Sequence, residues 1–86
     1  MMAYTNDLDA VAKKFGEGVT FQIEGQRYRV IIANVYFKPA NFLKTNYSEP
    51  ISGLGFTIED ACADYMRRQR DGFLWHKVSD KVERFI

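Results

Sequence analysis

The sequence has few of the residues on which disulfides, metal centres and membrane spans depend. Cys62 is the only cysteine, which excludes an intramolecular disulfide and a cluster of thiolate ligands. The longest apolar run, Val30 to Ala33, is far too short to span a bilayer. The start Met1-Met2-Ala3 leads directly into polar residues, so no apolar signal region is expected. These absences predict a cytoplasmic protein in a reducing compartment.

An excess of charge of one sign is also missing. The chain has 12 basic and 11 acidic residues, which give a formal net charge of +1. Such a balance argues against a general binder of polyanions and equally against an acidic mimic of DNA. The 86 residues have a hydrophobic share of 47%, which is ample for one core and leaves no room for a second. We therefore expect residues 1–86 to form a single small domain.

Residues that carry enzymatic chemistry are scattered singly. His76 is the only histidine; catalysis would require a nucleophile or a carboxylate beside it, and a metal site would require further ligands. Its position next to Trp75 in an expected strand favours a structural role. Gly53 and Gly55, in the stretch GLGFT, lack the further glycine and the lysine of a phosphate-binding loop. We therefore expect no enzymatic activity, no metal and no cofactor.

The clearest positive signal is a helix between Gly53 and Gly72. Thr57 is a good N-cap, and the Asp60 carboxylate, three residues later, can accept a hydrogen bond from the backbone N–H of the cap. Gly72 is expected to take the left-handed conformation that closes the helix. Acidic residues occupy the first turns and arginines the last, as the helix dipole favours. The apolar residues recur at helical spacing and form one stripe: Ile58, Ala61, Cys62, Tyr65 and Met66.

A second, shorter helix is expected near the N-terminus. Thr5 or Asn6 can cap it, and Gly16 and Gly18 can end it. Its apolar face consists of Leu8, Val11, Ala12 and Phe15. A helix of this length is marginal by itself, so it requires packing against the rest of the chain.

Alternation of apolar and polar residues predicts several strands. It indicates a half-buried strand over 19–24, and Gly25-Gln26 fits a two-residue hairpin turn with glycine first. In the return strand, both faces become apolar over 31–37 except at Asn34, which indicates a strand covered on both sides or a bulge near Ala33-Asn34. The rest is a long loop over 38–52 with room for one short strand, a short strand before the main helix, a strand over 73–78, a turn over 79–81 and a last strand over 82–86.

This order predicts an α+β fold. We expect an antiparallel sheet of four to five strands, with one main helix packed on a face and a short N-terminal helix. In the expected core, Ile58, Cys62, Tyr65 and Met66 of the helix pack against Phe21, Ile23, Val30 and Ile32 of the sheet.

Two groups of residues are candidates for binding a partner. Arg67, Arg68 and Arg70 end the main helix and can grip phosphates or carboxylates. Equally, they can compensate the helix dipole while Asp64 pairs with Arg68.

The second group lies in the proline-bounded loop. Phe42 and Tyr47 flank Lys44 and are expected to be exposed, whereas the core can take Tyr36 and Phe37. Aromatic side chains beside cations stack on unpaired bases. The same composition also forms hot spots in protein interfaces, so both interpretations stay open.

The stretch GLGFTIEDACADY, followed by DGFLW and VERFI, resembles the C-terminal half of small proteins common in bacteriophages and prophages. The pattern over 52–86 is a glycine pair, Thr57 followed by acidic residues, Tyr65, and a glycine before a strand pair. Its order is also similar to the antitoxin domain of the HicB type, which joins a three-stranded sheet with one helix and usually carries an added DNA-binding segment that has no counterpart here. The phage resemblance implies a small accessory protein that binds a host or phage macromolecule; anti-CRISPR proteins are of this size and style. It assigns no functional residue.

The sequence therefore favours a non-enzymatic phage or mobile-element accessory protein that binds and modulates another protein, such as an anti-CRISPR inhibitor. The alternative is a small nucleic-acid-binding protein that uses the arginine-rich helix end and the loop aromatics. A homodimer is also expected, because Val82, Phe85 and Ile86 make both faces of the last strand apolar. In the competing interpretation, Phe85 and Ile86 fold back onto the first helix and complete the core of the monomer.

Overall fold

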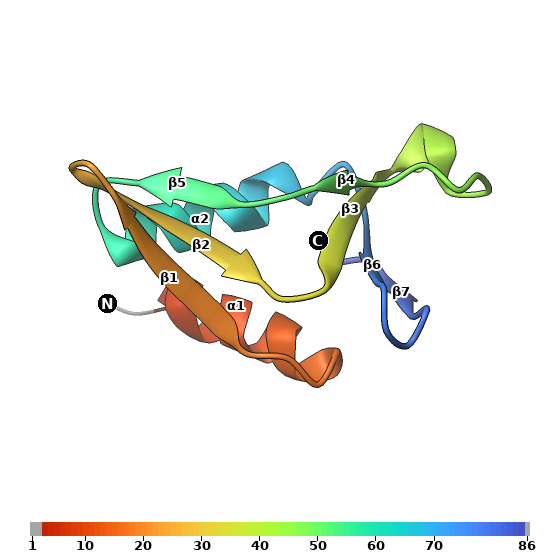
Figure 1. Ribbon diagram of the computed structural model, residues 1–86, viewed down its shortest axis with the longest axis horizontal. Coiled ribbons are helices and arrows are strands. Elements are labelled where there is room, and N and C mark those ends of the chain that lie inside the picture. The colour runs from red at the N-terminus through yellow and green to blue at the C-terminus, as the bar shows by residue number, and fades with distance from the viewer. Residues whose placement is uncertain (1–2, 86) are drawn as a thin grey trace.

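The computed structural model describes residues 3–85, and these contain two α-helices (Figure 1). Helix α1 spans Ala3–Lys14 and helix α2 spans Ile58–Arg68. At the start of α2, the Thr57 hydroxyl accepts a hydrogen bond from the backbone N–H of Asp60 at 3.0 Å. The predicted N-cap of the main helix is therefore confirmed.

Helix α1 has the predicted apolar face and the predicted end. Gly16 has a φ of 72°, which lies in the left-handed region that glycine adopts readily and that stops a helix. The predicted cap is wrong: Thr5 and Asn6 lie inside α1, so neither has the extended backbone of an N-cap. The face that packs inward is buried and consists of Leu8, Val11, Ala12 and Phe15.

The strands form two antiparallel sheets in the described part of the chain. The first sheet has the order β1-β2-β5, with β1 at Val19–Glu24, β2 at Arg27–Ile32 and β5 at Gly53–Gly55. The second has the order β4-β3-β6-β7, with β3 at Val35–Pro39, β4 at Glu49–Pro50, β6 at Gly72–His76 and β7 at Val82–Glu83. A short 3-10 helix, η1, spans Ala40–Phe42. The α+β class with antiparallel pairing is confirmed, and the strands are divided between two sheets.

The chain passes from the first sheet to the second at Ala33-Asn34. Strand β2 ends at Ile32 and β3 begins at Val35, and Asn34 between them has a φ of 62°, which asparagine tolerates better than most residues. Residues 31–37 therefore form neither one strand covered on both sides nor a bulged strand. The stretch is apolar on both faces because Ile32 and Val35 are both buried, on either side of a turn between sheets.

The β1–β2 hairpin and the loop that follows β3 agree with the sequence pattern. Gly25-Gln26 forms the two-residue turn, and only Gly25 has a positive φ, of 63°. The loop between β3 and β5 contains one short strand, β4, as predicted.

The last predicted strand is shorter than expected. Strand β7 ends at Glu83, and the Phe85 ring packs on Phe15, which follows α1, with ring centroids 6.0 Å apart. Phe85 thus takes the place that the competing interpretation gave it. Ile86, the other half of that expectation, lies outside the described residues.

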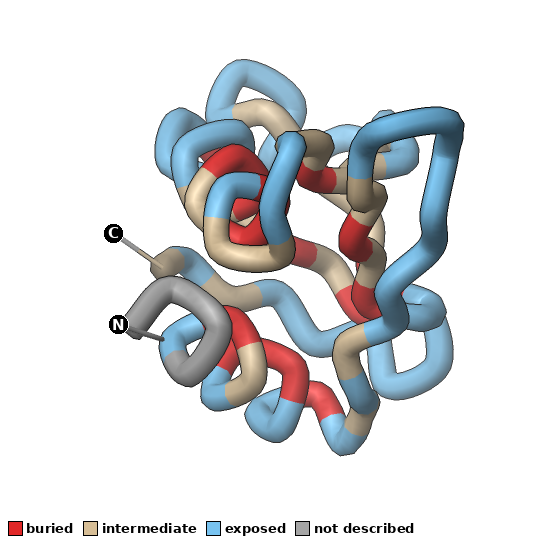
Figure 2. The backbone as a smooth tube through the Cα atoms, turned by 90° about the vertical axis from the view of Figure 1, so that its left-hand side faces the viewer, coloured by how far each residue is buried: buried red, intermediate tan, exposed pale blue. Residues whose placement is uncertain are grey.

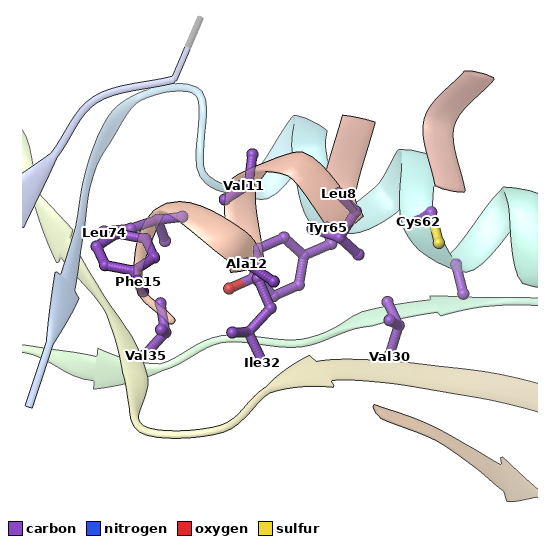
Figure 3. Close-up of a cluster of buried hydrophobic side chains, with 11 residues drawn as sticks. Leu8, Val11, Ala12, Phe15, Val30, Ile32, Val35, Cys62, Tyr65 and Leu74 are labelled. Carbon is purple, nitrogen blue, oxygen red and sulfur yellow. The ribbon is translucent and has the colours of Figure 1, made fainter. Parts of the chain in front are cut away.

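The core lies between the two helices and the inner faces of the strands (Figures 2 and 3). Cys62 and Tyr65 of α2 are buried together with Val30 and Ile32 of β2, as predicted. Helix α1 packs on α2, and α2 packs on β5 and β2. Partly buried side chains complete this core: Val19, Tyr28, Phe37, Ile51, Ile58, Met66 and Phe85.

The predicted burial of Phe21 and Ile23 is wrong. These side chains of β1 are 40% and 76% exposed. Strand β1 is the edge strand farthest from β5, and α2 packs on the sheet over β5 and β2. Alternation in the sequence identified the correct face of β1, but the helices leave Phe21 and Ile23 on that face exposed.

Glycine is required where α2 crosses β5. A Cβ on Gly53 would lie 2.0 Å from the backbone oxygen of Ala61, and a Cβ on Gly55 would lie 2.6 Å from the backbone nitrogen of Ala61. The predicted left-handed helix end at Gly72 is wrong, because Gly72 begins β6 and lacks a positive φ. Its glycine is required for space, since a Cβ there would lie 2.5 Å from the backbone oxygen of Lys38.

The described chain is elongated, with extents of 37 × 21 × 21 Å. The β1–β2 turn lies at one end and the loop that contains η1 at the other (Figure 1). Within residues 3–85, neither helix has the length and apolarity that crossing a membrane requires.

The close contact of α2 with β5 predicts a strong effect of one methyl group. Replacing Gly53 by Ala should lower the free energy of unfolding by about 3 kcal/mol, because the new Cβ meets helix backbone that cannot move aside. Gly18→Ala is the control: nothing lies within 4 Å of its added Cβ, so we expect a change of less than about 1 kcal/mol. Urea unfolding measures both, and equal effects would contradict the close contact.

Candidate partner-binding surface

A buried cation holds the long loop that follows β3. Lys38 is only 7% exposed, and its Nζ donates hydrogen bonds to the backbone carbonyls of Thr45 at 2.6 Å and Tyr47 at 3.0 Å. A buried ammonium group is costly unless its donors are satisfied, so these two hydrogen bonds stabilise one conformation of the loop. Lys38 thereby holds the loop over residues 40–48 against strand β3.

The loop also has hydrogen bonds of its own. The Thr45 hydroxyl donates to the carbonyl of Phe42 at 2.9 Å and accepts from the backbone N–H of Tyr47 at 3.1 Å. The Tyr47 hydroxyl donates to the Glu49 carboxylate at 2.6 Å, and this hydrogen bond raises the pKa of Tyr47. The loop is therefore ordered by its own side chains as well as by Lys38.

The outside of the loop presents apolar and aromatic side chains. Phe42 and Tyr47 are 42% and 44% exposed, as predicted, and their ring centroids lie 4.7 Å apart. Leu43 is 39% exposed, and Lys44 beside it is exposed as well. We call Phe42, Leu43, Lys44 and Tyr47 the loop surface.

A shallow groove of about 440 Å³ runs between the loop and the β6–β7 hairpin. The indole Nε1 of Trp75 donates to the Asp80 carboxylate at 2.7 Å, and the Tyr36 ring lies 5.9 Å from the Trp75 ring, so this wall is fixed. Tyr36 and Phe37 are both partly buried, in keeping with the expectation that the core can take them. The groove is lined by Lys38, Leu43, Lys44, Thr45, Asn46, Trp75, Asp80 and Val82. Its lining therefore combines apolar side chains with two lysines.

The predicted arginine group lies elsewhere, at the end of α2. Arg67 and Arg68 both donate to the carboxylate of Asp64, Arg68 through Nε at 2.7 Å. Arg70 has no ion-pair partner among the residues that the structure describes, and it lines, together with Arg67, a groove next to Asp60. The two predicted groups thus occupy separate places on the molecule. The pairing of Asp64 with Arg68, one of the two interpretations of the sequence, is confirmed.

Asp64 is the centre of this ion-pair cluster. The carboxylate is 8% exposed and also accepts the backbone N–H of Leu54 at 2.9 Å, which ties α2 to β5. Burial acts to raise the pKa of Asp64. The hydrogen bonds from Leu54 and Arg68 and the charges of Arg68 and Arg67 outweigh burial and hold this pKa below its ordinary value.

His76 has two partners that the sequence did not reveal. Its ring is 4% exposed; Nε2 lies 2.8 Å from the Glu17 carboxylate and Nδ1 lies 2.6 Å from the Ser79 hydroxyl. The backbone N–H of Ser79 also donates to Nδ1, so we assign the ring proton to Nε2, facing Glu17. This hydrogen bond lowers the pKa of Glu17.

The His76 cluster joins three segments of the chain. Asn34 also donates to the Glu17 carboxylate, at 3.3 Å, so the cluster links the α1–β1 connection, the β2–β3 turn and the β6–β7 turn. A carboxylate, an imidazole and a hydroxyl are the components of a nucleophilic site. Here His76 is buried, and its ring nitrogens are both engaged in hydrogen bonds that hold turns together. The spacing of Ser79 three residues after His76 could have suggested the local contact, whereas Glu17 is 59 residues away and left no signal.

Comparison with known proteins identified no relative of this chain. No protein-family model matches it, and neither a curated protein nor a solved structure matches it significantly.

The buried amino group of Lys38 predicts a local effect on the loop. Replacing Lys38 by Met removes both donors, so we expect amide hydrogens over 43–47 to exchange about tenfold faster or more. The free energy of unfolding should fall by about 1–3 kcal/mol, because the part-buried hydrogen bonds to the carbonyls of Thr45 and Tyr47 are lost. Lys44→Met, which changes an exposed amine in the same loop, is the control for hydrogen–deuterium exchange. Equal exchange rates in the two variants would contradict the role of Lys38 in holding the loop.

The ion pairs of Asp64 predict a contribution to the free energy of unfolding that depends on pH. Asp64→Asn should lower the free energy of unfolding by about 1–2 kcal/mol near pH 7, because the two arginines lie at the surface and only Asp64 is buried. A carboxyl with a depressed folded pKa stabilises the protein above its unfolded pKa of about 4, and this contribution is lost as the pH falls through the folded value. The difference between wild type and variant should therefore shrink in acid. Asp71→Asn, at an exposed carboxyl near the same helix end, should show no such pattern in urea titrations.

Proposed function

We propose that this chain is a non-enzymatic binding protein that engages and modulates another protein through the loop surface and the adjacent groove. The observation that carries the proposal is the exposure of Phe42, Leu43 and Tyr47 on a loop whose conformation is fixed from inside. Aromatic side chains around a partly apolar groove are typical of hot spots in protein interfaces.

The order of the loop supports this function energetically. A flexible loop loses conformational entropy on binding, whereas a loop held by Lys38 and Thr45 has already lost most of it. Phe42 and Tyr47 pack on each other, so their exposed faces are presented together in one arrangement. Such preorganisation favours a specific partner over non-specific apolar contact.

The chemistry of the groove indicates what the partner presents. Leu43 and Val82 offer apolar walls, and Lys38 and Lys44 also line the groove. An ammonium group has three donors, and Lys38 uses two of them on backbone carbonyls. A partner segment with an apolar side chain next to a carboxylate or a free carbonyl fits this arrangement.

The nucleic-acid alternative has less support. Arg67 and Arg68, which would bind phosphates, are already paired with Asp64, and the arginines do not line the groove beside Phe42 and Tyr47. A complex with nucleic acid uses unpaired cations and stacked aromatics on one continuous surface.

The proposed biological role and cellular location of this binding protein are based on the sequence. The resemblance of 52–86 to small phage and prophage proteins supports a role in a phage or mobile element, with a host or phage protein as the partner and counter-defence inhibition as one form of that role. The single cysteine supports a reducing compartment, so the proposed location is the cytoplasm.

Binding that depends on the loop surface tests the proposal. The immobilised chain should retain a protein from bacterial host lysate, and Phe42→Ala/Tyr47→Ala should weaken the measured affinity for that protein about 30-fold, which is about 2 kcal/mol. Leu43→Glu should act similarly, whereas Val78→Glu, at an exposed apolar residue in the β6–β7 turn, should not. Retention that is insensitive to the loop variants would contradict the proposal. A salt-sensitive complex with RNA or DNA, lost in the same variants, would favour the alternative.

A further inference from the structure

Strand β1 is an unprotected edge. It pairs with β2 alone, at the outer side of the first sheet (Figure 1), and every residue after Val19 is exposed. Its sequence, VTFQIE, has no proline and no lysine, and its one charged residue stands at the end. Natural proteins rarely leave a strand of this length and composition open, because its free backbone groups recruit another strand.

The other three sheet edges are protected in the usual ways. Strand β5 is only three residues long, and the Leu54 N–H donates to the Asp64 carboxylate instead of remaining free. Strands β4 and β7 have two residues each, and β4 contains Pro50. Short strands and proline are known protections of an edge, so β1 is the exception among four edges in the described residues.

The uncovered face of β1 is the continuation of the core face. Phe21 lies directly opposite Val30, and Ile23 directly opposite Tyr28, in the antiparallel register. Residues opposite each other share a face, so Phe21 and Ile23 extend the apolar surface that α1 and α2 cover farther along the sheet. Their exposures of 40% and 76% increase toward the hairpin turn.

The hairpin also fixes which backbone groups of β1 point outward. In a hairpin with a two-residue turn, Glu24 and Arg27 flank the turn and exchange both backbone hydrogen bonds. Alternate residues then point their N–H and C=O groups away from β2. These are Val19, Phe21 and Ile23, the same residues whose side chains lie on the apolar face.

We propose that β1 pairs antiparallel with β1 of a second copy of this chain, about a two-fold axis through Phe21. In this register Phe21 lies opposite Phe21 of the second copy, and Val19 lies opposite Ile23 of the second copy. All of these are residues with outward backbone groups, so each pair exchanges both hydrogen bonds. A register shifted by one residue would oppose apolar side chains to Thr20 and Gln22 and would break the hydrogen-bond pattern.

The two ends of β1 complement each other in this pairing. Val19 is partly buried against the core, whereas Ile23 is 76% exposed. The two-fold axis places the exposed Ile23 end of β1 in one copy next to the partly buried Val19 end of β1 in the other. Ile23 therefore gains the apolar neighbours that its own chain does not provide.

Charge does not oppose the pairing. Glu24 accepts hydrogen bonds from Arg29 at 2.5 and 3.0 Å, so its charge is already compensated. In the proposed register it lies opposite Gly18 of the second copy, a residue with open space around it. No like charges meet along the paired strands.

Light scattering and sedimentation over a range of concentrations test the pairing. A stable protein interface buries at least about 1,200 Å² of surface, and strand pairing alone buries less. We therefore expect a dissociation constant of the order of micromolar or weaker. Ile23→Lys should raise this constant about tenfold or more, because a two-fold axis makes each substitution count twice. Val78→Lys introduces the same charge at an apolar residue that is 72% exposed, and it should leave the constant unchanged. A wild-type chain that stays monomeric at about 1 mM, or equal effects of the two variants, would overturn the proposal.

A cross-linking experiment tests the register. Phe21→Cys places two thiols opposite each other across the axis, within the Cα separation of about 4.4–6.8 Å that a disulfide spans. Mild oxidation should give a covalent dimer in high yield. Phe56→Cys, at a ring that is 67% exposed, controls for random collision and should give little. Equal yields from the two variants would exclude pairing centred on Phe21. Binding of an unrelated peptide to the β1 edge, without self-association of the chain, would overturn the proposal and indicate a different occupant of this edge.

Discussion

Helix α2 lies so close to β5 that only glycine fits between them, and the rest of the structure depends on this contact. With Gly53 and Gly55 beneath it, the helix is fixed at one edge of the first sheet, where Asp64 reaches the Leu54 N–H. From there α2 covers β5 and β2 and leaves β1 open. The same position directs the chain into the second sheet at Gly72, where a side chain would again meet backbone.

The two surfaces that this arrangement leaves open lie at opposite ends of an elongated molecule (Figure 1). At one end, a buried amine orders the loop surface from within. At the other, the β1 edge carries apolar side chains and unpaired backbone groups on the same residues. In the proposed dimer both loop surfaces stay free, so a partner bound at two points would gain avidity without new contacts.

The sequence predicted the features that neighbours along the chain decide. The Thr57 cap, the apolar face of α1 and the turn at Gly25-Gln26 follow from backbone preferences and helical spacing, and all three are confirmed. The exposure of Phe42 and Tyr47 was also predictable, because a proline-bounded polar loop has little opportunity to bury large rings. Such signals are short in range and need no knowledge of the other elements.

Other features were decided only when distant segments met. Alternation in β1 marks its apolar face, but the position of α2 determines that Phe21 and Ile23 on this face are uncovered. The contact of His76 with Glu17, across 59 residues, and the burial of Lys38 beneath its own loop have no periodic signal at all. A sequence pattern states which side of an element avoids water. How far another element reaches across that side depends on three-dimensional packing, and here the close contact at Gly53 and Gly55 sets that reach.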